Sequence, residues 1–402
     1  MGGQTSRKQA AEHASPDASG RTIKRGGSAM DSATCPGPSS AALSPRGYMT
    51  PIDMPFGNKA ITNASRVFLA GPGSLVRLGN PMNANVEKLF PGREEIYDSI
   101  VDLVPGPDNP TPMVRVGERF NPRQDFELLV KLEGMNPFGS IKDRTAYYML
   151  RGMQLEDGQS IVEPSAGNTG IALAALANAR NTPIEIAVPE GVPEEKKDQL
   201  RFLGAEVIEV EDELCPIYPS EGARGVVRSM VESEAFNGKY VSPNQYESEL
   251  NVAAHYHSTG PEIWRQTGGR VDVFFASIGT GGTITGVGRY LKERNPNIRV
   301  IGVEPAQRHH KLSGLKRVTG LPEEHFPSIL DRDVVDAYIS VTDDEAFAAG
   351  IRIARTDGIL VGPTTGAVLH AASKWSEENA GTAVVISADN AAKYLSAYAD
   401  YL

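Results

Sequence analysis

The chain has 402 residues, of which 40% are hydrophobic, and carries a formal net charge of −10 at pH 7. That length and apolar content suffice for a sizeable core or two subdomains, while an acidic balance without a long basic run argues against nucleic acid as a partner. No window approaches the apolar length of a membrane span. The two cysteines, Cys35 and Cys215, lie far apart without a metal-type spacing, so we expect no metal site, no disulfide framework and a reducing, cytoplasmic location.

Residues 1–54 differ in composition from the rest of the chain. Ser, Gly, Ala, Arg and Pro dominate this segment, and its first aromatic residue is Tyr48. Such a segment cannot bury enough surface to offset its ordering entropy, so a disordered tail is predicted. A transit peptide is one alternative, and a start codon placed too early, with Met30 or Met49 as the true start, is another. Residues 55–108 mix apolar stretches with Gly and Pro turns, and we interpret them as an ordered extension that covers the core or a dimer partner.

Lys142 lies between a predicted strand and a predicted helix. The apolar run at 126–132 is typical of a strand, Pro137 and Gly139 allow a sharp turn, and residues 145–153 form a helix-like stretch. Near a helix N-terminus, the macrodipole and desolvation both disfavour the charged amine. A lysine that sheds its proton can form a Schiff base, whereas a surface lysine after a turn is the alternative for this stretch taken alone.

A second turn, at 163–170, places polar groups at a predicted helix start. Ser165, Asn168 and Thr169 present hydroxyl and amide groups just before an Ala- and Leu-rich stretch of high helix propensity. The unpaired backbone N–H groups at such a start suit a carboxylate, and an ordinary N-cap is the alternative.

A third turn follows the apolar run at 271–276 and contains three glycines within four residues, starting at Gly279. A chain of this kind can wrap closely around an anion with its N–H groups pointing inward. Thr280 and Thr283 add hydroxyl donors to phosphate oxygens. A dinucleotide-binding loop is the rival interpretation, but the spacing does not fit that pattern cleanly, and no lysine follows the last glycine as a Walker A loop requires.

Residues 309–320 form a basic segment punctuated by glycine. It contains side chains that are or can become cationic, among them Lys316 and Arg317. A solvated basic loop is one interpretation. Recognition of an anionic leaving group such as phosphate is the other, because arginine makes bidentate contacts with phosphate and lysine adds charge.

Short apolar strands alternate with helical stretches along most of the chain. Further strands are predicted at 184–188, 206–210, 300–303 and 383–386. This alternation is typical of an α/β fold with mostly parallel sheets.

Taken together, the three turns resemble the fold-type II pyridoxal-phosphate enzymes, within the family of cysteine synthase and cystathionine β-synthase. The resemblance runs from about Pro110 to about Leu395. The segments that match are Thr111–Pro112, residues 136–144, 163–170, 244–246, 260–264, 279–286 and 358–366.

The resemblance implies a role for each matched residue. Lys142 would be the Schiff-base lysine and would move the proton at Cα. The cofactor, pyridoxal 5′-phosphate, would be held by Asn168, Gly279, Thr280, Gly281, Gly282, Thr283 and Thr364. The substrate α-carboxylate would be bound by Ser165, Gly167, Thr169 and Gln245. Thr364 stands where the family usually has a serine beside the pyridine nitrogen, and such a hydroxyl leaves the ring a weaker electron sink, which suits β-elimination.

Two positions depart from the family pattern, and both bear on the substrate. Ala166 replaces a serine that is common in sulfhydrylases, and Phe138 replaces a small residue and would narrow the pocket beside Lys142. The Phe after Asn-Pro, the N-terminal extension and the basic segment with Lys316 and Arg317 are similar to the O-phosphoserine sulfhydrylase subgroup. The last two residues would therefore bind substrate.

The implied activity is β-replacement on an O-activated L-serine, either O-phosphoserine or O-acetylserine, through a bound aminoacrylate. Sulfide as nucleophile would give L-cysteine. The alternatives are an amine or homocysteine as nucleophile, giving a diaminopropionate derivative or cystathionine, a serine or threonine dehydratase, and a catalytically inactive binding module. The implied fold has two subdomains, at 109–245 and 246–402, with mostly parallel twisted sheets flanked by helices as in the tryptophan synthase β-subunit, and the implied assembly is a homodimer.

Overall fold

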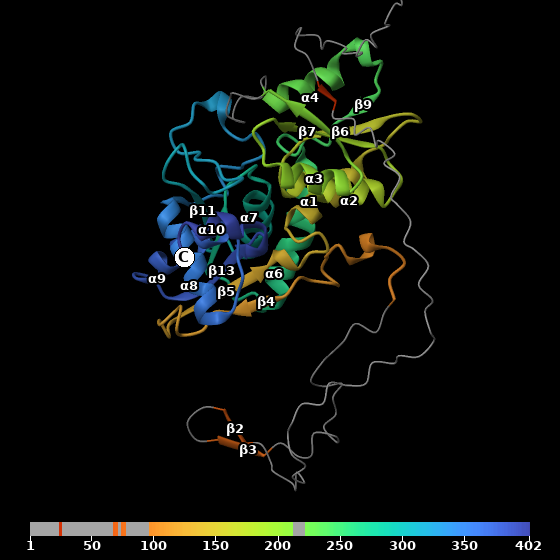
Figure 1. Ribbon diagram of the computed structural model, residues 1–402. Helices are drawn as coiled ribbons and strands as arrows, with labels where there is room; N and C mark the ends of the chain where they lie inside the picture. The colour runs from red at the N-terminus through yellow and green to blue at the C-terminus, as the bar shows by residue number, and fades with distance from the viewer. Residues whose placement is uncertain (1–23, 26–66, 71–73, 78–95, 212–221) are drawn as a thin grey trace, which may run out of the picture. The chain divides into compact units, whose positions relative to one another are not determined.

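The computed structural model describes residues 24–25, 67–70, 74–77, 96–211 and 222–402 (Figure 1). The chain divides into two compact units, one formed by Met1–Gly27 with Tyr97–Leu402 and the other by Ser28–Ile96. In the second unit, β2 (Val67–Ala70) pairs antiparallel with β3 (Ser74–Arg77). Cys35 and Cys215 lie outside the described residues.

The first sheet of the larger unit has five strands in the order β1-β8-β7-β6-β9. Its strands are β1 (Lys24–Arg25), β6 (Ser160–Pro164), β7 (Ile184–Pro189), β8 (Glu206–Val210) and β9 (Tyr240–Val241). They pair in parallel, apart from β1, which is antiparallel to β8. Of the segment predicted as a disordered tail, only β1 is described.

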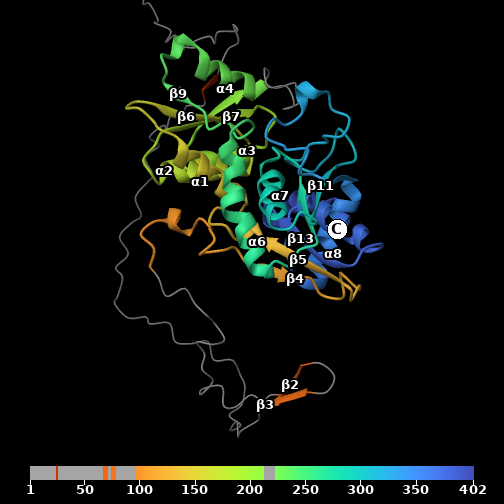
Figure 2. The ribbon, with the colours of Figure 1, turned by 180° about the vertical axis from the view of Figure 1, so that it is seen from behind.

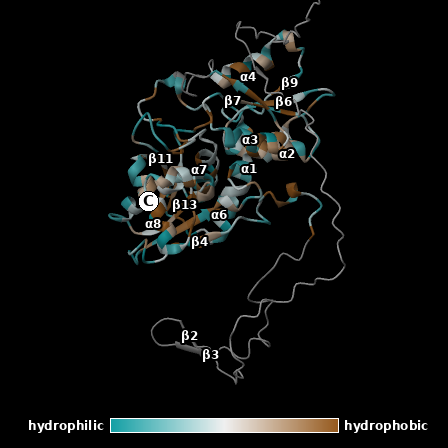
Figure 3. Ribbon diagram, in the orientation of Figure 1, coloured by the Kyte–Doolittle hydropathy of each residue, from teal (hydrophilic) through white to brown (hydrophobic). Residues whose placement is uncertain are grey.

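Helices cover both faces of this sheet because successive strand residues point to opposite sides. One face packs against α1 (Lys142–Gly152), α2 (Asn168–Asn178) and α3 (Glu194–Phe202). The other packs against α4 (Gly222–Glu232). Most residues of α3 are hydrophilic (Figure 3), although its last residue, Phe202, is apolar and exposed.

The second sheet has six strands in the order β12-β11-β10-β13-β5-β4. Its strands are β4 (Met113–Arg115), β5 (Phe126–Leu132), β10 (Val273–Ser277), β11 (Arg299–Pro305), β12 (Ala337–Val341) and β13 (Gly381–Ser387). Only β4 runs antiparallel among these described strands. One face packs against α6 (Gly260–Thr267) and α7 (Gly282–Arg294) (Figure 2). The other face packs against α8 (Asp343–Asp357), α9 (Pro363–Ser376) and α10 (Leu395–Ala399).

The α/β fold class and the mostly parallel sheets are confirmed, whereas the division between the sheets differs from the expected boundaries. Strand β5 was expected in the N-terminal subdomain, but it lies in the six-stranded sheet between β13 and β4. Its side chains explain this placement, because Phe126, Leu128 and Val130 enter one core cluster of that sheet and Leu129 enters the other. The chain therefore leaves the second sheet after β5 and reaches the first sheet through the loop before α1. No helix among the described residues is long and apolar enough to cross a membrane.

Candidate active site

Lys142 lies at a helix N-terminus, as expected, and is the first residue of α1, which begins three residues before the predicted stretch at 145–153. The turn depends on Gly139, whose φ of 82° lies in the left-handed region that favours glycine. It is held by Asp143, whose Oδ2 accepts a 2.6 Å hydrogen bond from the Phe138 N–H, and by Ser140, whose Oγ accepts from the Lys142 N–H. Burial lowers the pKa of Lys142 to about 8, although the Asp389 carboxylate acts in the opposite direction. A lysine amine in this state is readily available as a nucleophile.

A buried cluster of charges fixes the start of α1 beneath Lys142. Arg144 donates through Nε to Glu133 Oε2 at 2.7 Å and through Nη1 to Glu262 Oε1 at 2.5 Å. Lys131 of β5 donates to Glu262 Oε2 at 2.6 Å. All four side chains are fully buried, with paired charges. The cluster therefore ties α1 to β5 and α6 at the base of the site.

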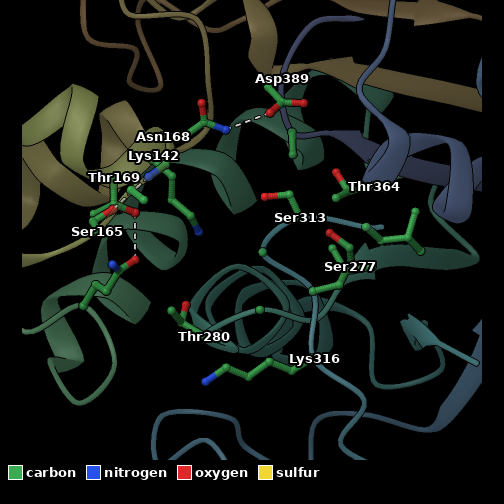
Figure 4. A pocket seen from close by; sticks show the side chains of 18 of the residues that line it. Lys142, Ser165, Asn168, Thr169, Ser277, Thr280, Ser313, Lys316, Thr364 and Asp389 are labelled. Carbon is green, nitrogen blue, oxygen red and sulfur yellow. Dashed lines mark hydrogen bonds between the residues drawn. The ribbon is translucent and has the colours of Figure 1, made fainter. Parts of the chain in front are cut away.

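The second predicted turn lies at the start of α2, with Gly167 as N-cap and Asn168 as first helical residue. Ser165 Oγ accepts from the Gly170 N–H at 2.9 Å, and Thr169 Oγ1 donates to Gln245 Oε1 at 2.7 Å. A side chain at Gly167 would meet nothing within 4 Å, so the backbone there faces open space. The four residues predicted to bind a carboxylate thus line one cavity at the start of α2, and Figure 4 shows Ser165 and Thr169 among them.

Glu163 positions Gln245 and was not predicted. Its carboxylate accepts from the backbone N–H groups of Asn244 and Gln245 at 3.0 and 3.1 Å, and from Ser242 Oγ at 3.0 Å. Burial raises the pKa of Glu163 to about 7. Glu163 lies at the carboxyl end of β6, next to the predicted turn, and this position was the signal in the sequence from which its role in the site could have been predicted.

The glycine-rich loop forms the N-terminus of α7. Gly281 is the N-cap with φ of 96°, and a Cβ there would come within 2.6 Å of Leu330 Cβ, so this position requires glycine. Thr280 Oγ1 accepts from Asn251 Nδ2 at 3.0 Å, and Thr283 Oγ1 lies 3.2 Å from His255 Nε2. The free N–H groups and the dipole of a helix start attract an anion such as phosphate.

A network around Asn168 is the main part of the site that the sequence did not predict. Asn168 donates through Nδ2 to Asp389 Oδ2 at 2.7 Å and accepts at Oδ1 from Lys393 Nζ at 2.8 Å. Tyr394 donates to the same Asp389 oxygen at 2.5 Å. The amide is therefore fixed in one orientation by its donor and acceptor contacts. Asp389 lies just beyond the carboxyl end of β13, where an α/β sheet commonly binds ligands, and this was the signal available in the sequence.

The basic segment is held in place by Glu304, an acidic residue whose role the sequence left open. Its Oε2 accepts from the backbone N–H groups of Val318 and Thr319 at 2.8 and 2.9 Å. Lys316 Nζ lies 4.8 Å from the centroid of the Tyr246 ring. Arg317 is exposed, and its Nη1 donates to the Ala306 carbonyl at 3.1 Å.

These elements enclose a cavity of about 1720 Å³. All of the predicted site residues line it except Gly282: they are Lys142, Ser165, Gly167, Asn168, Thr169, Gln245, Gly279, Thr280, Gly281, Thr283, Lys316, Arg317 and Thr364. Ala166 lines the cavity as well, whereas Phe138 packs against the helices of the first sheet and, among the described residues, is not part of the wall. The expectation that Phe138 narrows the pocket is therefore wrong.

The cavity fits pyridoxal phosphate on the chemistry of its walls. A buried amine with a pKa of about 8 can bind the aldehyde, and the start of α7 can hold the phosphate. The Asn168 amide, oriented by Asp389, and the Thr364 hydroxyl at the start of α9 lie on the same cavity and could hold the cofactor ring.

Three comparisons with known proteins bear on this arrangement. The family described as pyridoxal-phosphate dependent enzyme matches residues 104–389. The chain is 40% identical over 298 residues to a cysteine synthase from Aquifex aeolicus, covering 71% of this chain and 88% of that protein. It is 37% identical over 305 residues to cysteine synthase B from Pseudomonas aeruginosa, covering 75% and 96%. The crystal structure of a hydrogen sulfide-producing enzyme from Fusobacterium nucleatum matches with a TM-score of 0.66 and 31% identity, covering 75% of this chain and 98% of its own.

Proposed function

This chain belongs to the pyridoxal-phosphate-dependent enzymes of the cysteine synthase type, and from that premise we propose that it makes L-cysteine from sulfide and an O-activated L-serine. The observation that carries the proposal is the meeting of three groups on one cavity: the Lys142 amine, the start of α7 and the pair Thr169–Gln245. They supply a covalent anchor, a phosphate site and a carboxylate site.

The cavity residues have two roles, which are cofactor binding and proton transfer. Bound pyridoxal phosphate supplies the electron sink that allows a group on Cβ of an amino acid to be exchanged. Lys142 would hold the cofactor through its amine, and as a free amine with a pKa of about 8 it would take up and return the substrate Cα proton. Thr364 offers a hydroxyl to the ring nitrogen.

Substrate recognition follows from the walls of the same cavity. The α-carboxylate is bound by Ser165, Thr169 and Gln245 with the backbone at Gly167, which keeps Cα within reach of Lys142. Support for O-phosphoserine over O-acetylserine as the donor comes from the cationic side chains of Lys316 and Arg317 on the wall. The homodimer implied by the family resemblance belongs to this proposal too.

The test supplies the holoenzyme with sulfide and either O-phosphoserine or O-acetylserine and measures L-cysteine. We expect product from at least one donor and none from Lys142→Ala. Pyruvate released without any nucleophile would instead indicate a dehydratase, and product only with homocysteine would indicate cystathionine synthesis. A Lys142→Ala variant that matches the parent rate would contradict the proposal.

A further inference from the structure

Two cationic side chains, one from α4 and one from the basic segment, contact one aromatic ring on the cavity wall. The Arg224 guanidinium carbon lies 4.2 Å from the centroid of the Tyr246 ring, and Lys316 Nζ lies 4.8 Å from it. Arg224 belongs to α4 on the first sheet, whereas Lys316 follows β11 of the second sheet. All three residues line the cavity, and Figure 4 shows Lys316 among the side chains there.

The environment of Arg224 leaves positive charge on this wall. Its carboxylate partner, Glu247, lies 3.4 Å away and is shared with Arg228 at the same distance. Two guanidinium groups therefore share Glu247, while Glu232 also contacts Arg228 at 3.8 Å and the Glu163 carboxylate also acts on Arg224. The side chain of Arg224 is only 14% exposed, so its charge is poorly screened by water. Burial lowers the pKa of Arg224, as expected for a cation whose partners do not fully compensate its desolvation.

The position on the wall indicates which part of a substrate would be recognised. Tyr246 directly follows Gln245, which belongs to the proposed carboxylate site. A group carried on the side chain of an amino acid bound there, or a nucleophile approaching its Cβ, would come close to this wall. The acetyl ester carries no charge and hydrosulfide has no oxygen acceptors, whereas a tetrahedral oxyanion can accept bidentate hydrogen bonds from arginine and a further one from lysine.

We propose that Arg224 and Lys316 together form a binding site for a tetrahedral oxyanion, carried either by a phosphorylated serine donor or by an anionic sulfur nucleophile such as thiosulfate. This inference rests on the proposed function, because it deepens the specificity of the same cavity. Both cations contact Tyr246, and Arg224 would contribute a contact from α4, which packs on the other sheet from the one that precedes the basic segment.

The test compares holoenzymes of the parent, Arg224→Ala and Arg228→Ala. Arg228 is the matched control, since it lies one turn further along α4, shares Glu247 and is not among the described cavity-lining residues. Isothermal titration with inorganic phosphate gives the affinity, and kcat/KM is measured with O-phosphoserine and with O-acetylserine. Loss of a charge-assisted contact should weaken phosphate binding about 10- to 100-fold in Arg224→Ala. Arg224→Lys should recover part of this loss, and Arg228→Ala should match the parent.

The kcat/KM values distinguish whether the oxyanion belongs to the phosphorylated donor or to the nucleophile. A loss confined to O-phosphoserine assigns the site to the leaving group, whereas a loss confined to O-acetylserine with thiosulfate assigns it to the nucleophile; both support the proposal. Unchanged phosphate affinity, or equal losses with every substrate pair, would overturn it and leave Arg224 as a packing partner of Tyr246. If Arg224→Ala does not fold, Arg224→Gln is tested in its place, with the same measurements of phosphate affinity and kcat/KM. A parent that makes cysteine from neither donor would contradict the proposed function, while phosphate titration would still test the site.

Discussion

At the scale of single residues, the chemistry depends on how the protein sets the charge of Lys142. Burial lowers the pKa of its amine to about 8, and the nearby Asp389 carboxylate keeps that pKa from falling further. Asp389 also orients Asn168 and accepts from Tyr394. One carboxylate thus acts on both the amine proposed to anchor the cofactor and the amide proposed to bind the ring oxygen.

Replacing Asp389 should change the pH at which the cofactor is loaded. A negative charge favours the protonated amine, so Asp389→Asn removes that effect and lowers the pKa of Lys142. The neutral amine then predominates at lower pH, and the midpoint for holoenzyme formation from apoprotein and pyridoxal phosphate should move to lower pH. The measurement is the rate at which visible absorbance appears as a function of pH. Tyr394→Phe, which keeps the carboxylate, should shift the midpoint less, and an unshifted Asp389→Asn profile would contradict this account.

At the scale of elements, buried ionic contacts hold the start of α1 in addition to the hydrogen bonds of Ser140 and Asp143. Its N-cap, Ile141, makes no side-chain cap hydrogen bond. The buried cluster of Lys131, Glu133, Arg144 and Glu262 joins α1 to β5 and α6 instead. Because every member is fully buried, loss of one charge leaves its partners without compensation.

Glu262→Gln should therefore destabilise the apoprotein strongly. The substitution keeps the shape of the side chain but leaves Arg144 and Lys131 with less negative charge, and breaking a buried pair typically costs about 3–5 kcal/mol. Urea unfolding followed by circular dichroism should show a clearly lower midpoint. The control is Glu232→Gln, which affects the exposed contact with Arg228 and should leave the midpoint unchanged. Equal midpoints for both variants would show that the cluster does not stabilise α1.

The elements that could be predicted are those determined by local sequence. The strand expected at 126–132 matches β5, and the turns before α1, α2 and α7 were located from their glycine and polar residues. The sheet that β5 joins could not be predicted, because its pairing with β13 depends on residues from the other end of the chain. The roles of three further residues could not be predicted for the same reason. Each acquires its role only through contacts made in the folded chain, and they are Asp389, Glu163 and Arg224.

At the scale of the whole molecule, the route of the chain explains why the site lies where it does. Strands β4 and β5 belong to the six-stranded sheet, and the loop after β5 carries the chain and Lys142 to the five-stranded sheet. The carboxyl ends of strands in both sheets supply the remaining groups, from Glu163 on one side to Asp389 on the other. The expectations for residues 1–108 as tail and extension stay predictions.

The most direct test of the central claim is to identify the amine that holds the cofactor. The holoenzyme is reduced with borohydride, digested and mapped by mass spectrometry. We predict a pyridoxyl adduct on Lys142 and none on Lys393, which also lines the cavity and whose pKa is likewise lowered by burial. An adduct on Lys393, or no adduct on any peptide, would contradict the assignment of Lys142 as the anchoring residue.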